Sequence, residues 1–248
     1  MRSELEKQDV FFSYPKPIEL ITYLLKIGAE PKDSVVLDFF AGSGTTAEAC
    51  YRLNNEDGGN RSFILVQLPE LIDTKSQAYK HGYRTLSEIS KLRIKKAANR
   101  YENLSNKHLG FRVFKCDESN MKDVYFEPKD LVQSELINFM DNIKEDRTDL
   151  DLLFDCMLKW GVRLSEPMTK NEIDGCTVYN VNEGNLVACF SEMVSESVIS
   201  VIAEMDPLRV VFRDSSFNEA SEKMNLFEIF KQKCGWSDEE VRKNVKVI

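Results

Sequence analysis

Apolar and polar positions along the first half of the chain predict helices and strands in turn. Apolar residues recur at helical spacing over 18–28, and a glycine ends this helix. The short apolar run 34–38 is typical of a buried parallel strand, and it leads into the glycine-containing turn 41–45. A helix over 46–53 and a second buried strand over 62–66 follow. This order predicts the first unit of a doubly wound α/β sheet, in which ligands bind where the strands end.

The following segments predict one more helix, one more strand and then a change of domain. The composition of 85–100 favours a helix, and the apolar run 110–114 favours a third strand. From about 127 to 149 the chain is charged and poor in long apolar runs, apart from a short helix expected over 131–140. We therefore expect the boundary between two domains in this stretch.

The resulting domains are 1–125 and 126–248, and the second is expected to be a smaller α/β unit. Its apolar pattern predicts a helix, a hairpin of two strands, a second helix and a further strand, over 150–160, 177–181 with 186–190, 195–205 and 208–212. The apolar stripe of the first helix has two readings, a surface for a partner protein or simply part of the core.

Composition places the chain among globular proteins rather than membrane proteins. Apolar residues make up 42% and charged residues 30% of the 248 positions, enough for one large core or two modest ones. The apolar runs are far shorter than the roughly 20 residues needed to cross a bilayer. The N-terminus carries no pattern typical of an export signal. We therefore expect a cytoplasmic protein without membrane contact.

Cysteine and histidine usage argues against a metal site. The six cysteines include no CxxC pair and most lie in apolar stretches, where a thiol behaves as a small apolar group. The two histidines, His81 and His108, are far apart and not clustered with cysteines. We expect structural cysteines and no metal.

Charge is distributed unevenly between the two predicted domains. Residues 1–125 hold 19 Lys/Arg against 17 Asp/Glu, a net +2, and residues 126–248 hold 14 against 24, a net −10. Because the second domain is negatively charged, the phosphate backbone of DNA would repel it. We therefore expect any DNA contact in the first domain or in a part outside this sequence. The basic residues of the 85–100 helix have two readings, a solvated face or a phosphate contact, and they are Lys91, Arg93, Lys95, Lys96 and Arg100.

The most informative segment is 37–46, with the sequence LDFFAGSGTT. Glycines allow a tight turn and the close approach of a ligand, and the amide groups of the following helix attract a carboxylate. Gly42, Gly44 and Ala47 also satisfy the dinucleotide pattern, which leaves a nicotinamide or flavin enzyme open from spacing alone. The dinucleotide pattern requires an acidic residue at the end of the second strand to hold the ribose. This chain has Gln67 at that position, and the nearest carboxylate is Glu70.

The segment 37–45 resembles motif I of amino-methylating DNA methyltransferases of the permuted class, in which the catalytic motif comes first. In that class a Pro-Lys-Pro motif X precedes motif I, as 13–17 does here. Further segments resemble the methylation (Mod) subunits of type III restriction-modification systems, namely 57–70, 82–90, 158–161 and 207–214. The resemblance covers nearly the whole chain. It implies a partial Rossmann-like sheet of an S-adenosylmethionine-dependent methyltransferase, followed by a second, smaller α/β domain.

The resemblance also implies a set of residues that bind S-adenosylmethionine. Motif I would hold the methionine part of the cofactor, with Asp38, Phe39, Phe40, Ala41, Gly42, Ser43, Gly44 and, at the helix start, Thr45. Motif X would close the pocket with Tyr14, Pro15 and Lys16, and Gln67 or Glu70 would hold the ribose. Asp117 has two readings, an approach to the adenine ring or an exposed acid in a loop.

The chain lacks the tetrapeptide that performs the chemistry in this family. Adenine methylation needs a flipped base that stacks on an aromatic ring, and groups that accept hydrogen bonds from the amine of that base. In this family the tetrapeptide Asp-Pro-Pro-Tyr supplies the ring and these groups. None of the seven prolines is adjacent to another. We therefore expect no catalytic residues here, and an inactive C-terminal portion of an adenine-specific DNA methyltransferase.

The expected partners follow from the same resemblance. They are DNA, bound through a missing or separately encoded N-terminal half, a second Mod chain and the type III restriction (Res) subunit. A chain that only binds other proteins of such a complex, without enzymatic activity, is the alternative hypothesis.

Overall fold

The computed structural model describes residues 5, 10–12, 14–105, 109–122, 142–217 and 220–248. The chain forms two compact units, unit 1 (Met1–Val113) and unit 2 (Phe114–Ile248). The division falls after residue 113, whereas the sequence pattern placed it after residue 125. The short helix expected over 131–140 lies outside the described residues.

Unit 1 contains a pair of parallel strands joined by a helix, as the sequence pattern predicted. β1 and β2 pair in parallel, from Val35 opposite Ser62 to Asp38 opposite Leu65. The elements are α2 (Ile18–Gly28), β1 (Val35–Asp38), α3 (Thr45–Asp57), β2 (Ser62–Leu65), α4 (Gln77–Lys80) and α5 (Leu86–Ser105). The strand, turn, helix, strand order is therefore confirmed, and so is the mixed α/β class.

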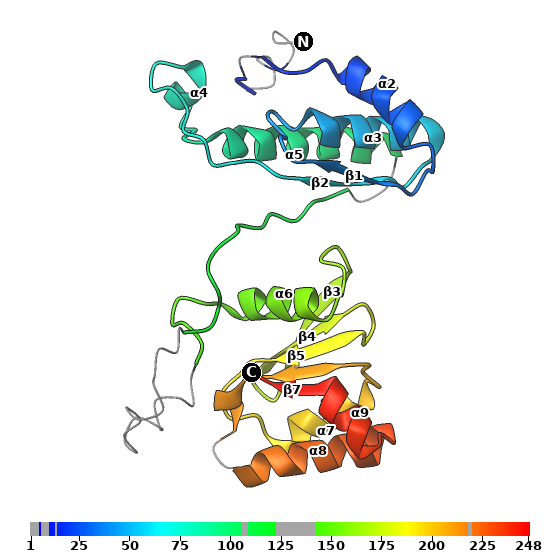
Figure 1. Ribbon diagram of the computed structural model, residues 1–248, viewed down its shortest axis with the longest axis vertical. Coiled ribbons are helices and arrows are strands. Elements are labelled where there is room, and N and C mark those ends of the chain that lie inside the picture. Colours follow the sequence, from blue (N-terminus) through cyan, green and yellow to red (C-terminus); the bar gives the residue numbers. More distant parts are fainter. Residues whose placement is uncertain (1–4, 6–9, 13, 106–108, 123–141, 218–219) are drawn as a thin grey trace. The chain divides into compact units, whose positions relative to one another are not determined.

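The helices of unit 1 pack on one face of this strand pair. Figure 1 shows α3 and α5 on the same side of β1 and β2, with α2 against α3. Small and aromatic side chains fill the space between α3 and α5, among them Ala47, Tyr51, Ala97 and Ala98. Small residues let the two helix backbones come close, which brings α5 directly to the start of α3.

The prediction that the strands β1 and β2 are buried is wrong. Val35 and Leu37 are 62% and 61% exposed, and Ile64 is 54% exposed. Successive side chains of a strand point to opposite faces, so every second residue points away from α3 and α5. Within the described part of unit 1 the second face has no covering helix.

The prediction of a third strand over 110–114 is also wrong. This segment is described and has no strand partner among the described residues. Leu109 and Phe111 pack against the core of α3 and α5, and the Tyr51 hydroxyl donates to the Gly110 carbonyl at 3.2 Å. Phe111, its neighbour Leu109 and this hydrogen bond hold the segment, whereas Val113 and Phe114 are 58% and 50% exposed, so the apolar run does not form a buried strand.

Unit 2 is built on a mixed sheet with the strand order β3-β4-β5-β6-β7. The pairs β3–β4 and β4–β5 are antiparallel, and β5–β6 and β6–β7 are parallel. The elements are α6 (Asp149–Lys159), β3 (Met168–Ile173), β4 (Cys176–Val181), β5 (Leu186–Cys189), α7 (Glu196–Glu204), β6 (Val210–Phe212), a 3-10 turn (Asp214–Ser216), α8 (Ala220–Cys234), α9 (Asp238–Asn244) and β7 (Val245–Val247). The predicted helices, hairpin and strand of this domain are confirmed.

The sheet of unit 2 has a core on each face. In Figure 1, α6 covers one face and α7 and α8 cover the other. The apolar stripe of α6 is core, because Leu152, Leu153, Cys156 and Met157 are buried against the sheet. No helix in the described parts of either unit is both long and apolar enough to cross a membrane.

Candidate cofactor site at the glycine turn

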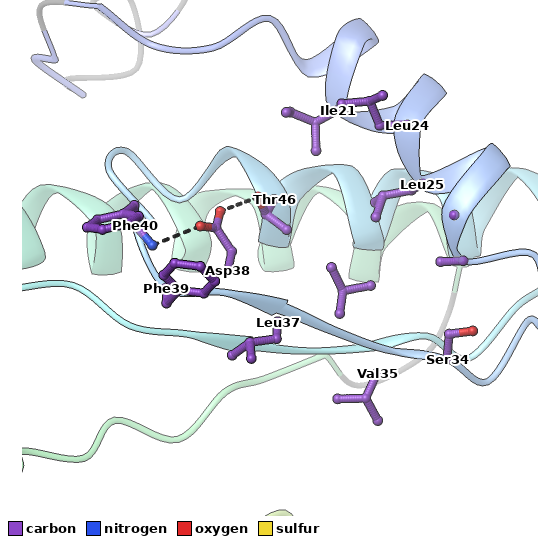
Figure 2. A pocket seen from close by; sticks show the side chains of 13 residues that line it. Ile21, Leu24, Leu25, Ser34, Val35, Leu37, Asp38, Phe39, Phe40 and Thr46 are labelled. Atoms are coloured by element: carbon purple, nitrogen blue, oxygen red, sulfur yellow. Dashed lines mark hydrogen bonds between the residues drawn. The ribbon is translucent and has the colours of Figure 1, made fainter.

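The end of β1 is fixed by the carboxylate of Asp38. Its Oδ1 accepts from the Phe40 amide at 3.0 Å, and its Oδ2 accepts from the Thr46 hydroxyl at 2.6 Å. Figure 2 shows both bonds at the point where β1 meets the start of α3. Asp38 therefore ties the strand end to the helix start and sets the width of the turn between them.

The two glycines of the turn are needed for different reasons. Both have left-handed backbone, with φ +54° at Gly42 and +77° at Gly44. A Cβ at Gly44 would lie 3.0 Å from Ile94 Cγ1 of α5, whereas a Cβ at Gly42 would meet the Phe12 ring at 3.7 Å. Gly44 is therefore required by close packing of α5, and Gly42 by the turn itself.

Gln67, just after β2, closes the turn from the side of the second strand. The Gly42 amide donates to Gln67 Oε1 at 2.7 Å, and Gln67 Nε2 donates to the Leu68 carbonyl at 3.1 Å. Glu70 is exposed, and its backbone carbonyl accepts from the Leu86 amide at 2.9 Å. Of the two candidates for the ribose, Gln67 is the one that contacts the turn.

A buried ionic network lies against the turn. Arg93 of α5 donates to Glu48 Oε2 at 2.7 Å, to Ser43 Oγ at 2.6 Å and to Thr45 Oγ1 at 2.7 Å. The Arg93 and Glu48 side chains are 3% and 8% exposed. Arg100 also contacts Glu48, at 3.0 Å.

The reading of the basic run as one solvated face is therefore wrong for Arg93. Lys91 and Lys95 are exposed, as that reading expects. Arg93, in contrast, shares the inner face of α5 with Ser90 and Ala97, three residues before and four residues after it, both of which are buried. The spacing of Arg93 from Ser90 and Ala97 could have predicted its place on the inner face of the helix. The charge pattern alone did not indicate this.

The motif X segment passes beside the start of α3. The Thr45 hydroxyl lies 3.5 Å from the Lys16 carbonyl oxygen, while the Tyr14 side chain is exposed and Pro15 half-buried. Phe39 and Phe40 are exposed as well, with ring centroids 5.2 Å apart. Exposed aromatic rings thus gather on both segments next to the turn.

An open pocket of about 610 Å³ lies between α2 and β1, and Asp38, Phe39 and Phe40 form one end of it. This volume is in the range of small-molecule sites, about 300–1,000 Å³. Figure 2 shows side chains of α2 and β1 around it. Of the expected cofactor residues, Asp38, Phe39 and Phe40 alone line this pocket. Ala41, Ser43, Gly44 and Thr45 are buried in the turn, and the remaining expected residues are not in the lining either, namely Tyr14, Pro15, Lys16, Gly42, Gln67 and Glu70.

Two further expectations concern groups away from the turn. Asp117 pairs with Lys115 at 3.1 Å and Arg147 at 3.8 Å, all residues of unit 2. A hydrogen bond from the Glu118 amide, with help from Lys115, lowers the pKa of Asp117. In the described parts of the chain, no group of three His, Cys, Asp or Glu side chains is arranged to hold a metal ion.

Comparison with known proteins matches the chain to DNA-modifying enzymes. Residues 2–72, which include motif X and the glycine turn, match the family described as DNA methylase. The EcoPI Mod subunit of Escherichia phage P1, a type III restriction-modification enzyme, is 36% identical over 227 residues, 86% of this chain and 33% of that protein. The EcoP15I Mod subunit of Escherichia coli is 32% identical over 229 residues, 89% of this chain and 33% of that protein.

Shorter matches fall in the same group of proteins. The type III StyLTI Mod subunit of Salmonella typhimurium is 44% identical over 110 residues, 43% of this chain and 17% of that protein. The type II methyltransferase M.KpnI of Klebsiella pneumoniae is 38% identical over 98 residues, 40% of this chain and 23% of that protein. The resemblance found in the sequence is thus confirmed. Over most of its length the chain is therefore a homologue of the type III Mod subunits, and it spans about a third of the length of the first two relatives.

Proposed function

We propose that this chain is the S-adenosylmethionine-binding portion of a DNA adenine N6-methyltransferase, the modification subunit of a type III restriction-modification system. The observation that carries the proposal is the glycine turn after β1, with the Asp38 carboxylate fixed beside a pocket of about 610 Å³. When bound, the cofactor would supply an electrophilic methyl group. The protein's own residues bind and orient it.

The residues at the turn suit the parts of this cofactor. Its methionine end carries an ammonium group, for which the Asp38 carboxylate is a charged acceptor. Its adenine ring is flat and aromatic, and Phe39 and Phe40 are exposed rings at the edge of the pocket. Tyr14, Pro15 and Lys16 close the site from the motif X side in this proposal.

The carboxylate of the cofactor has a defined target in the turn. Amide groups at the start of a helix attract anions. In the turn before α3, the Gly42 amide already donates a hydrogen bond to the Gln67 side chain. A carboxylate that takes this amide must displace Gln67 Oε1. The displaced amide side chain can then donate to and accept from the ribose hydroxyls, so we favour Gln67 over Glu70 for that role.

The proposal includes no methyl transfer by this chain alone. The sequence holds no adjacent prolines, and so no Asp-Pro-Pro-Tyr tetrapeptide to orient a flipped adenine. DNA, a second Mod chain and the Res subunit are the proposed partners, and the cytoplasm the proposed location. Incubation of the purified chain with DNA and cofactor carrying a labelled methyl group should give no labelled DNA. Labelled DNA well above a boiled-protein control would contradict this part.

Isothermal titration calorimetry with S-adenosylmethionine tests the binding function. We expect the unaltered chain to bind it in preference to NAD, and Gly42→Arg to abolish binding. Gly58→Arg is the matched control, because Gly58 also has left-handed backbone (φ +70°) but lies at the far end of α3 with open space around it. Preference for NAD would favour a nicotinamide enzyme. No heat with either ligand would favour a chain that only binds proteins.

A further inference from the structure

The inner face of α5 holds four consecutive residues of the glycine turn. The Ser90 hydroxyl donates to the Gly42 carbonyl, and Ile94 fills the space where a side chain at Gly44 would lie. Arg93 lies between these two and donates to the hydroxyls of Ser43 and Thr45. One helix face therefore contacts the turn at every position from 42 to 45.

The Arg93 guanidinium restrains the turn on both sides of Gly44. Its Nη1 donates to the side chains before and after that glycine, and these two hydroxyl oxygens lie 3.1 Å apart. A buried cation is stable only when it is paired, and Glu48 supplies the opposite charge from the first turn of α3. Moving the turn would therefore break bonds to a charge that water cannot reach.

We propose that Arg93, assisted by Ser90, is a positioning residue that holds turn 42–45 in the conformation that binds S-adenosylmethionine. This inference rests on the proposed function. Arg93 is buried, so it acts on the cofactor through Ser43 and Thr45 rather than by touching it. Residue 93 also lies outside the segment 2–72 that matches the DNA methylase family, which places this support in a part of the chain beyond that match.

The chain contains a matched buried arginine at the opposite end of α3. The Arg61 side chain is also 3% exposed, pairs with Asp57 at 3.0 Å, and donates to the Ala29 carbonyl at 2.8 Å. The hydrogen bonds that Arg61 donates go to Asn54 and Asp57 at the end of α3 and to Ala29 after α2, and none of these residues is in the glycine turn. A purely structural role predicts the same consequences for both arginines, and a positioning role does not.

The experiment compares Arg93→Lys with Arg61→Lys in the full chain. Lysine keeps the positive charge but lacks the planar fork that reaches a carboxylate and two hydroxyls at once. With both variants shown to be folded by circular dichroism, calorimetry should give an affinity for S-adenosylmethionine about tenfold weaker for Arg93→Lys, or about 1.4 kcal/mol. For Arg61→Lys we expect an affinity within about twofold of the unaltered chain.

A second measurement needs no cofactor. The amide resonances of Gly42 and Gly44 in nitrogen-15 spectra should shift in Arg93→Lys and stay in place in Arg61→Lys. If Arg93→Lys does not fold, Ser90→Ala replaces it, because this change removes the bond to the Gly42 carbonyl without touching the buried charge. The same shift of both glycine resonances and a weaker affinity are then expected.

The outcomes separate the inference from the proposed function. If the unaltered chain binds S-adenosylmethionine and the α5 variant binds it equally well, the role of Arg93 is overturned and the proposed function stands. If the unaltered chain binds none, the proposed function fails and the positioning role fails with it. Equal losses of affinity in Arg93→Lys and Arg61→Lys would also overturn the role, since they would indicate a general effect on unit 1.

Discussion

Gly44 and Gly58 flank α3, and their surroundings predict different costs for the same substitution. Both have left-handed backbone, which costs an alanine about 1–2 kcal/mol. A Cβ at Gly58 meets nothing within 4 Å, whereas one at Gly44 would lie 3.0 Å from Ile94. Urea unfolding should therefore show a larger loss of stability for Gly44→Ala than for Gly58→Ala. Equal losses would mean that α5 moves freely away from the turn.

Cysteine reactivity should separate buried from exposed thiols in the folded chain. Burial raises the pKa of Cys50 to about 12 and the pKa of Cys156 and Cys189 to about 11, and the thiolate is the reactive form. Cys116 is exposed. Timed treatment with iodoacetamide at pH 8, read by mass spectrometry of peptides, should label Cys116 first and the three buried cysteines only after denaturation. Early labelling of Cys50 would contradict its burial on α3, where it packs with Leu25 and Ala29.

At the residue scale, the sequence predicted the turn better than it predicted what supports it. Asp38 at the end of β1 accepts from the Phe40 amide, and Gly42 has left-handed backbone in the turn that follows, as motif I suggests. Arg93 was missed, because the charge pattern treats the basic residues of a helix alike. Its partner Glu48 is 45 positions away in the sequence, and only tertiary structure brings the two together.

The start of α6 carries a reciprocal cap that should make its stability depend on pH. Thr148 Oγ1 accepts from the Asp151 amide, and Asp151 Oδ2 accepts from the Thr148 amide at 2.8 Å. The hydrogen bond from the Thr148 backbone amide, together with the one from the Thr148 hydroxyl, lowers the pKa of Asp151. A lowered pKa in the folded state stabilises the protein above the pKa of the unfolded state, about 3.9, and the effect disappears as pH falls through the folded value.

The variant Asp151→Asn tests this cap. Thermal unfolding should show it to be less stable than the unaltered chain at pH 7, and the difference should shrink below about pH 4 as the carboxylate is protonated. Because Asp151 is exposed, solvent screens part of the effect, and the difference should be small. Thr148→Ala, which removes the other half of the cap, should cost about 1 kcal/mol. If the difference in stability between the unaltered chain and Asp151→Asn does not change with pH, the charge of Asp151 is not its cause.

At the element scale, apolar periodicity predicted the helices and strands in which many side chains are buried. It missed the elements in which few side chains are buried. α6, α7 and the β4–β5 hairpin follow the predicted ranges closely, whereas α3 continues to Asp57, four residues past its predicted end. β3 was not predicted, since its central residues are polar and exposed, although Asp174 and Gly175 after it have the left-handed backbone of a hairpin turn. α8 was also missed, because charged residues surround its two fully buried side chains, Leu226 and Phe230.

At the scale of the whole molecule, the similarity to Mod subunits extends beyond unit 1. Unit 1 ends at residue 113, yet the alignments with the EcoPI and EcoP15I Mod subunits run over 227 and 229 residues. A large part of unit 2 must therefore take part in both matches. The acidic second half, with a net charge of −10 over residues 126–248, thus belongs to the shared sequence rather than to an unrelated addition.

The two compact units should respond separately to the cofactor. Both tryptophans, Trp160 and Trp236, lie in unit 2, so tryptophan fluorescence reports the unfolding of that unit, while circular dichroism reports the helices of both. A ligand that binds only the folded unit 1 at 100 times its dissociation constant stabilises it by about 2.7 kcal/mol. S-adenosylmethionine should therefore raise the melting temperature of part of the dichroism signal and leave the fluorescence transition unchanged. A fluorescence transition that shifts together with the dichroism would mean that the two units unfold as one.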